Sequence, residues 1–244
     1  GGSDFGISLA DVEGIITDVN AIAHNGSNSS IRLSEQDDNL ILRNLELAPG
    51  SSEAAFFASQ SRWIEVDGMT VLGSPAIEVD YSAGSLSGLN LAGEGSGTAI
   101  IVHHNRGSNS LSVDESDISG YSVGLSLHGH SGDEFNHPVE SIGNVIDCTT
   151  AIASDGLPFV STGDSLMGAI EIDSANVVEG KLVNTAFTSI TATGNATVVA
   201  WEDYSITLMM FDTGIDASAS IDVSNPHDAS TFSFSNQGSQ WDLM

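Results

Sequence analysis

The amino-acid sequence predicts an all-β fold in which a single chain winds into a parallel β-solenoid. Three observations lead to this prediction. A six-residue pattern recurs between residues 20 and 173, segments of alternating apolar and polar residues separate many of its copies, and no part of the chain spaces its apolar residues as a helix does. Together these features indicate short strands that stack coil after coil.

The recurring pattern has a small residue in its second place, an apolar residue in its third and, in most copies, another in its fifth. Its copies begin 18 to 34 residues apart: NAIAHN (20–25), AAFFAS (54–59), PAIEVD (75–80), TAIIVH (98–103), VGLSLH (123–128), TAIASD (150–155) and GAIEID (168–173). Alternate residues of a strand point to opposite faces. We therefore expect the third and fifth places to point inward, with Ile77, Ile100, Leu125 and Ile152 in one interior column.

A second alternating segment precedes most copies, as in LILRNLEL (40–47) and WIEVDGMTV (63–71), and clusters of Gly, Ser, Asn and Asp between segments predict turns. Two or three strands in about 22 residues describe one coil of a solenoid. Trp63 opens one of these segments, and we expect it to pack against its neighbours, with stacking on a sugar ring as the alternative.

The domain organisation follows from where the repeat holds. After residue 175 the pattern loosens, and the aromatic residues there suit a segment that covers the open end of the stack. The sequence predicts a processed or engineered N-terminal end at 1–6, parallel β-helix coils over 7–225 and a C-terminal capping segment at 226–244.

The repeat resembles that of the right-handed parallel β-helix superfamily, the pectate-lyase-like solenoids, over roughly residues 7–225. This resemblance implies a right-handed coil. It lies in the repeat pattern and not in a catalytic motif. Lyases of the superfamily use Arg or Lys with Ca²⁺-binding carboxylates, yet Arg43, Arg62 and Arg106 do not share a column of the repeat here.

Related hydrolases of the polygalacturonase type carry an Asp-Asp pair and a Gly-His-Gly stretch. In this chain Asp37-Asp38 lies far from Gly129-His130-Ser131-Gly132, and the other hydrolase motifs have no counterpart. The sequence therefore predicts no catalytic residue, although an enzyme remains the alternative.

Charge narrows the possible partners. Thirty-three Asp and Glu face five Lys and Arg, for a net charge of −28. Nucleic acid and anionic lipid need clustered basic residues, so we expect neither as a partner. The acids suit a protein that stays soluble in salty water, or alternatively one that collects Ca²⁺ on carboxylates. No apolar run approaches the roughly 18 residues that a membrane span needs, so we expect no membrane insertion.

The single cysteine and three N-glycosylation patterns indicate where in the fold and in which compartment these residues lie. Cys148 lies in an apolar stretch, where we expect a buried small side chain, and a single cysteine excludes an internal disulfide. Asn25, Asn28 and Asn195 fit the N-glycosylation pattern, which favours an extracellular or cell-surface location.

The sixth place of the repeat should point outward, because the third and fifth point inward. It carries Asp80, His103 and His128 on consecutive copies, and His130 and Asp133 follow in the adjacent loop. Strands in neighbouring coils lie about 4.8 Å apart, so these side chains form a ladder. The ladder could hold a ligand or a divalent metal (Ca or Zn), could supply an acid and base, or could simply be solvated surface.

These observations favour a non-catalytic extracellular or cell-surface module from a salt-adapted organism. Such a module would bind glycans or form part of a larger surface protein beside neighbouring domains, with no certain cofactor. The alternative is a polysaccharide lyase or glycoside hydrolase that acts on an extracellular polysaccharide.

Overall fold

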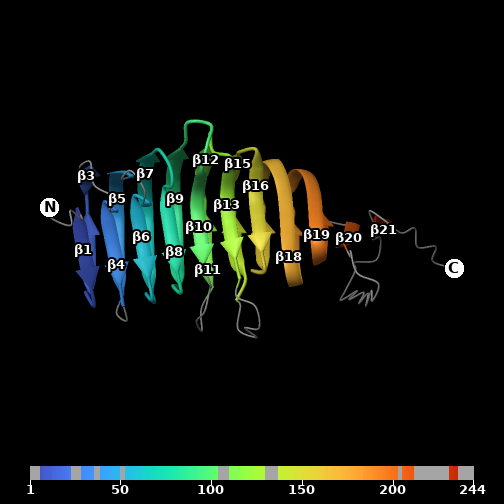
Figure 1. Cartoon of the computed structure of the whole chain (residues 1–244), viewed down its shortest axis with the longest axis horizontal. Coiled ribbons are helices and arrows are strands. Elements are labelled where there is room, and N and C mark those ends of the chain that lie inside the picture. Colours follow the sequence, from blue (N-terminus) through green and yellow to red (C-terminus); the bar gives the residue numbers. More distant parts are fainter. Residues whose placement is uncertain are drawn as a thin grey trace.

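The computed structural model describes residues 6–22, 29–35, 39–49, 53–103, 110–129, 137–202, 205–211 and 231–235, with the backbone alone at 21–22, 174–177, 192–195, 197 and from 200 onward. Within these residues the chain forms β-strands and no helix, and most strands pair in parallel with the coils before and after them (Figure 1). The predicted all-β parallel solenoid is confirmed. Among the described residues, no helix is long and apolar enough to cross a membrane.

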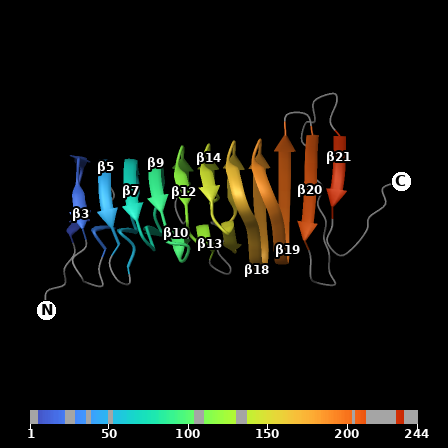
Figure 2. The same cartoon turned by 90° about the horizontal axis from the view of Figure 1, so that it is seen from above.

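Each coil contributes strands to three faces, which we name A, B and C. Figure 2 shows the strands of successive coils lying side by side along the axis of the stack. Face A comprises β1 (Ile7–Ala10), β4 (Ile31–Ser34), β6 (Phe56–Ser59), β8 (Ile77–Asp80), β10 (Thr98–His103), β13 (Val123–His128), β16 (Thr150–Asp155) and the middle segments of β18 (Ser165–Val183) and β19 (Ala186–Glu202).

Faces B and C share several long strands that bend between them. Face B comprises β2 (Gly14–Thr17), the first halves of β5 (Leu40–Ala48), β7 (Ile64–Leu72) and β9 (Gly84–Ala92), then β11 (Leu111–Asp114), β14 (Val139–Ile142), β17 (Phe159–Thr162) and the last segments of β18 and β19. Face C comprises β3 (Asn20–Ile22), the second halves of β5, β7 and β9, then β12 (Asp117–Ser119), β15 (Val145–Asp147) and the first segments of β18 and β19.

The interior is a set of stacked apolar columns. Ile77, Ile100, Leu125 and Ile152 occupy one register position on successive strands of face A, and each is at most 1% exposed. The predicted interior column is therefore confirmed. Cys148 is also buried, as predicted, and burial raises the pKa of its thiol.

The bend from face B to face C recurs at one position in each coil. The residue that follows each face B strand has a left-handed backbone; these residues are Asp18, Asn44, Gly68, Gly88, Glu115, Gly143, Gly163 and Asn184. A left-handed residue turns the chain sharply, and glycine adopts it without steric cost.

A polar ladder lies inside this bend and connects the later coils. Ser116 Oγ accepts a hydrogen bond from the Leu89 N–H, Asn144 Oδ1 accepts from the Ser116 N–H, and Asp164 Oδ1 accepts from the Asn144 N–H. These three polar side chains are at most 2% exposed. Each one thus satisfies a buried backbone donor of the preceding coil.

The parallel pairing of successive strands is interrupted after β19. β20 (Ser205–Phe211) pairs with β19 antiparallel, and β21 (Thr231–Ser235) pairs with β20 in parallel. The remainder of the predicted cap, at 226–230 and 236–244, lies outside the described residues.

Candidate functional site

The predicted outward ladder on face A exists as a run of paired residues. Ser59 of β6 pairs with Asp80 of β8, Asp80 pairs with His103 of β10, and His103 pairs with His128 of β13. All four side chains point away from the core, because the inward positions of the same strands are filled by buried apolar residues. The register predicted from the repeat is therefore the observed one.

The two histidines stack on each other. Their ring centroids are 5.0 Å apart, close to the spacing of the strands that carry them, and the ring planes differ by 20°. His128 Nε2 lies 2.9 Å from the hydroxyl of Ser126, two residues earlier on the same face. This contact and the stacking on His103 both fix the position of the His128 ring.

Glu78 joins the site, although the sixth place of the repeat does not predict it. It lies two residues before Asp80 on the outer side of β8, and its Oε1 is 3.6 Å from His103 Nε2. The signal was present in the repeat: its fourth place also points outward, and in PAIEVD that place is Glu78. The sixth place alone therefore captured only one of two outward columns.

Burial raises the pKa of the Glu78 carboxyl above its ordinary value, and the negative charges of Asp80 and Glu53 add to this effect. The Arg32 guanidinium opposes it. Because the Glu78 side chain is only 28% exposed and lies near other carboxylates, it holds a proton more readily than a fully solvated glutamate.

An aromatic and cationic pair lies further along the same face. Arg32 of β4 places its guanidinium carbon 4.7 Å from the centroid of the Phe57 ring on β6. Phe57 is paired in register with Glu78. The outer side of face A therefore runs, coil by coil, from Arg32 and Phe57 through Glu78 and Asp80 to the stacked histidines.

Trp63 differs from the prediction. It lies in the bend from face A to face B, four residues after Ser59, and its side chain is 53% exposed. Its φ of 60° is the left-handed region, which is unusual for a bulky residue. This bend holds four residues between Ser59 and Ile64, against three between Asp80 and Gly84 in the next coil. The bend with the exposed indole is thus one residue longer, a difference that strand alternation does not reveal.

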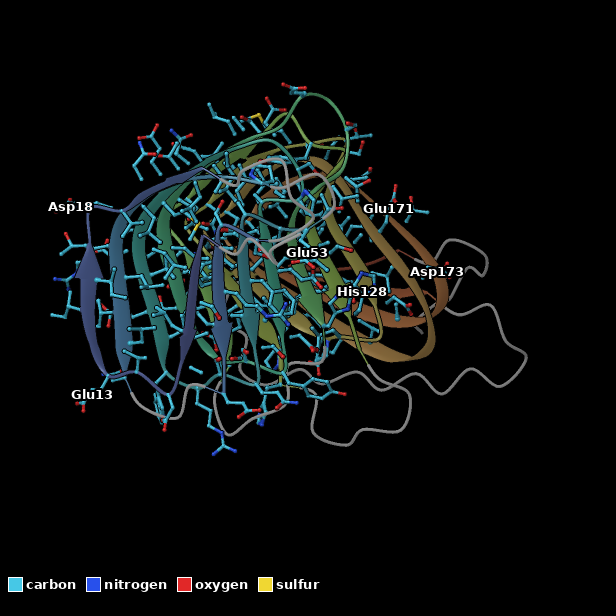
Figure 3. All side chains as sticks on the ribbon, turned by 60° about the vertical axis from the view of Figure 1, so that its left-hand side comes forward. Glu13, Asp18, Glu53, His128, Glu171 and Asp173 are labelled. Atoms are coloured by element: carbon cyan, nitrogen blue, oxygen red, sulfur yellow. The ribbon has the colours of Figure 1, made fainter. Side chains whose placement is uncertain are left out.

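Several predicted residues lie outside what the structure describes. They are His130 and Asp133 of the ladder loop and the sequon residues Asn25 and Asn28; Asn195 lies within β19, where the backbone alone is described. Among the described residues, no group of three or more His, Cys, Asp or Glu is placed to hold a metal ion. The divalent metal therefore stays a prediction, since two of its five proposed ligands are not described. Figure 3 labels His128 between Glu53 and the pair Glu171 and Asp173.

The arrangement offers a row of hydrogen-bonding groups with an exposed indole at its edge. Carboxylates accept hydrogen bonds, imidazoles donate or accept them, and an indole presents an apolar face. Glu78 and His103 can in addition form an ion pair when the imidazole is protonated and the carboxyl is ionised.

Comparisons with known proteins give no relative for this chain. No protein-family model, no curated protein and no solved structure matches it.

Proposed function

We propose that this protein is a non-catalytic β-solenoid module that binds a glycan along the outer side of face A, in a salt-rich extracellular or cell-surface setting. The observation that carries the proposal is the outward ladder of Ser59, Asp80, His103 and His128, with the exposed Trp63 in the bend that follows Ser59. Sugar rings stack on indole faces, and their hydroxyls need closely spaced donors and acceptors.

The regular spacing of the ladder supports a polymeric ligand. Strands along face A repeat about every 4.8 Å, so a linear chain lying along the stack meets one polar group after another. The net charge of −28 supports the salt-rich setting. The finer expectations of a right-handed coil and of membership in the pectate-lyase-like superfamily belong to this proposal, and the repeat pattern supports them.

Binding of soluble oligosaccharides tests the proposal. A panel of neutral and acidic plant and bacterial oligosaccharides would be titrated by calorimetry into the wild type, Trp63→Ala, His103→Ala and Leu72→Ala. Leu72 is the matched control, because it is 68% exposed but lies on face C. We expect at least tenfold weaker binding for the first two variants and wild-type binding for Leu72→Ala. Equal affinity of Trp63→Ala and the wild type would reject the site.

The alternative, a polysaccharide-degrading enzyme, has one observation in its favour: Glu78 combines a raised pKa with a neighbouring imidazole. The same panel would be incubated with the protein, and new reducing ends and unsaturated products would be measured. Turnover by the wild type that Glu78→Gln abolishes would replace the binding module by the enzyme. Binding without turnover supports the module.

A further inference from the structure

The outer side of face A carries more negative than positive charge. Within the face A strands that the structure describes, the carboxylates that point outward lie on three strands: Glu78 and Asp80 on β8, Asp155 on β16, and Glu171 and Asp173 on β18. In those same strands Arg32 of β4 is the one Lys or Arg. The surface on which we place the glycan is therefore acidic.

The remaining basic residues do not reverse this balance. Arg43 and Lys181 lie on face B, where each contacts acidic side chains. Arg62 lies in the bend between β6 and β7. Arg106, the last of the five Lys and Arg of the chain, belongs to a loop outside the described residues. Wherever its side chain lies, a ligand along face A meets a surplus of carboxylates.

The outward carboxylates form two groups, one on β8 and the other on β16 and β18. The strands β8, β10, β13, β16 and β18 pair in that order along face A. At about 4.8 Å for each step, the two groups lie roughly 14 to 19 Å apart. Figure 3 shows Glu171 and Asp173 of the second group beyond His128, on the side away from Glu53. The stacked imidazoles thus lie between two acidic groups.

The first group is crowded enough to affect its own ionisation. Burial, and then repulsion from Asp80 and Glu53, raise the pKa of the Glu78 carboxyl. A positive group supplied by a ligand would relieve this repulsion and favour the ionised carboxylate. The negative charge at this end of the ladder is therefore a feature that a cation can use.

An independent observation shows how this surface holds a cation. The guanidinium carbon of Arg32 lies 4.7 Å from the centroid of the Phe57 ring, and the charge of Arg32 opposes the rise in the pKa of Glu78. An aromatic face together with a carboxylate is a combination that recognises organic cations. Trp63, exposed in the bend that follows β6, offers a second aromatic face, and tryptophan is the best residue for this contact.

We propose that the glycan of face A is positively charged, a polymer of amino sugars whose amino groups are free. This inference rests on the proposed function and names the class of its ligand. Ammonium groups of the polymer contact the two acidic groups, while a sugar ring stacks on Trp63. One amino sugar reaches only one acidic group, so binding requires several linked units. An acidic glycan is disfavoured, because its carboxylates would face those of the protein.

Oligosaccharides that differ in charge but share a backbone provide the test. Hexamers of β-1,4-linked glucosamine, N-acetylglucosamine and glucose, the glucosamine dimer, and a galacturonic acid hexamer would be titrated by calorimetry. The buffer is at about pH 6, where amines are protonated and carboxyls are ionised. It contains about 1 M NaCl, because a Debye length of about 3 Å suppresses general attraction to the net charge.

Matched protein variants separate the two acidic groups from charge elsewhere. Each loses two carboxylates: Glu78→Gln with Asp80→Asn, Glu171→Gln with Asp173→Asn, and Asp117→Asn with Asp147→Asn as the control. The control residues are exposed on the outer side of face C. Thermal melts check folding. Because Glu171 and Asp173 are exposed, their variant decides the question if loss of the half-buried Glu78 carboxylate destabilises the other.

We expect the glucosamine hexamer to bind the wild type about tenfold more tightly than the N-acetylated hexamer, and each face A variant to bind it about tenfold more weakly. The face C variant should bind it as the wild type does, and the glucosamine dimer should bind more weakly than the hexamer.

Equal binding of the glucosamine hexamer to the face A and face C variants would show only general attraction to an acidic protein, and would overturn the inference. Tighter binding of a neutral or acidic hexamer that Trp63→Ala weakens would also overturn it, but would leave the proposed function standing. If none of the hexamers binds, both the inference and the proposed function are wrong.

Discussion

Two adjacent isoleucines of β10, Ile100 and Ile101, have the same side chain and opposite environments. Ile100 is fully buried in the interior column, whereas Ile101 lies on the outer side of face A between Glu78 and Ser126 in register. The pair therefore separates the effect of burial from the effect of side-chain type within one strand.

Truncation of Ile100 to Ala should lower the free energy of unfolding by about 2–5 kcal/mol, because it leaves a cavity between stacked coils. Ile101→Ala should cost about 1 kcal/mol or less, since its side chain is only partly buried. Urea denaturation of both variants measures the difference. Equal losses would mean that the inward and outward columns have been exchanged.

Asp164 gives a prediction of pH dependence. Burial raises the pKa of its carboxyl above the ordinary 3.8, even though Ser161 and Asn144 donate hydrogen bonds to it. The folded state therefore binds the proton more tightly than the unfolded state. Its contribution to stability is greatest below the unfolded pKa and falls as the pH rises through the folded pKa.

Asp164→Asn removes this contribution, and its amide oxygen can still accept from the Asn144 N–H. The free energy of unfolding of the variant, relative to the wild type, should therefore increase as the pH rises from 3.8 toward neutrality. Denaturation at a series of pH values measures the difference, in which the other carboxylates cancel. A difference that does not change with pH would show that the carboxyl titrates alike in both states.

Site residues could be predicted from the sequence where they lie in strands, because alternation there defines which side chains point outward. It placed Asp80, His103 and His128 in one column, because alternation and repeat length together define register. It missed Glu78, whose column holds Ile101 in the next coil and so shows no polar pattern. The predicted packing of Trp63 was wrong, because the residue lies in a bend with a left-handed backbone, where strand alternation does not define the side-chain direction.

Within the strands, a comparison of Gly14 with Gly84 separates two costs of adding a side chain: backbone strain and collision with the neighbouring coil. Both glycines start a face B strand with nearly the same backbone conformation. Gly14→Ala should cost about 1–3 kcal/mol from backbone strain alone. Gly84→Ala should cost clearly more, because its Cβ would collide with the backbone of Ile64.

Thermal melts of the two glycine variants give the comparison directly. A larger loss of melting temperature for Gly84→Ala than for Gly14→Ala is expected. Similar losses would indicate that a further segment lies over Gly14 and restricts it as Ile64 restricts Gly84.

The strands could be predicted from the sequence more completely than the bends. Alternating apolar residues define β5, β7 and β9 over most of their length. The left-handed residue that ends each face B strand is Asp, Asn, Glu or Gly, so no single residue type identifies the bend. The polar ladder of Ser116, Asn144 and Asp164 was also not predicted, because polar residues after a turn signal usually indicate solvent.

For the whole molecule, the net charge of −28 makes stability depend on salt. Repulsion among carboxylates opposes the compact state, and ions screen it over about 10 Å at 0.1 M and about 3 Å at 1 M. The melting temperature should therefore rise between low and molar NaCl. A midpoint that stays constant or falls would count against salt adaptation.

A chelator separates general screening from specific cation sites. At fixed salt, EDTA removes bound Ca²⁺ but leaves the ionic atmosphere nearly unchanged, so only a protein with specific sites loses stability. We expect no shift of the melting temperature at molar NaCl. A fall in the melting temperature on addition of EDTA would show that some of the carboxylates bind Ca²⁺ at specific sites.

The left-handed bend residues imply that the length of this molecule can change in units of one coil. Gly68 and Gly88 occupy the same place in successive coils, and Met69 pairs in register with Leu89. A gene from which codons 69–88 were excised would join Gly68 to Leu89, so that a left-handed glycine is again followed by a buried apolar side chain. The shortened protein would keep every remaining column continuous and be about 4.8 Å shorter along its axis. Homologues that differ by in-frame gain or loss of such units would therefore preserve the architecture while changing how many groups face A offers to a polymer.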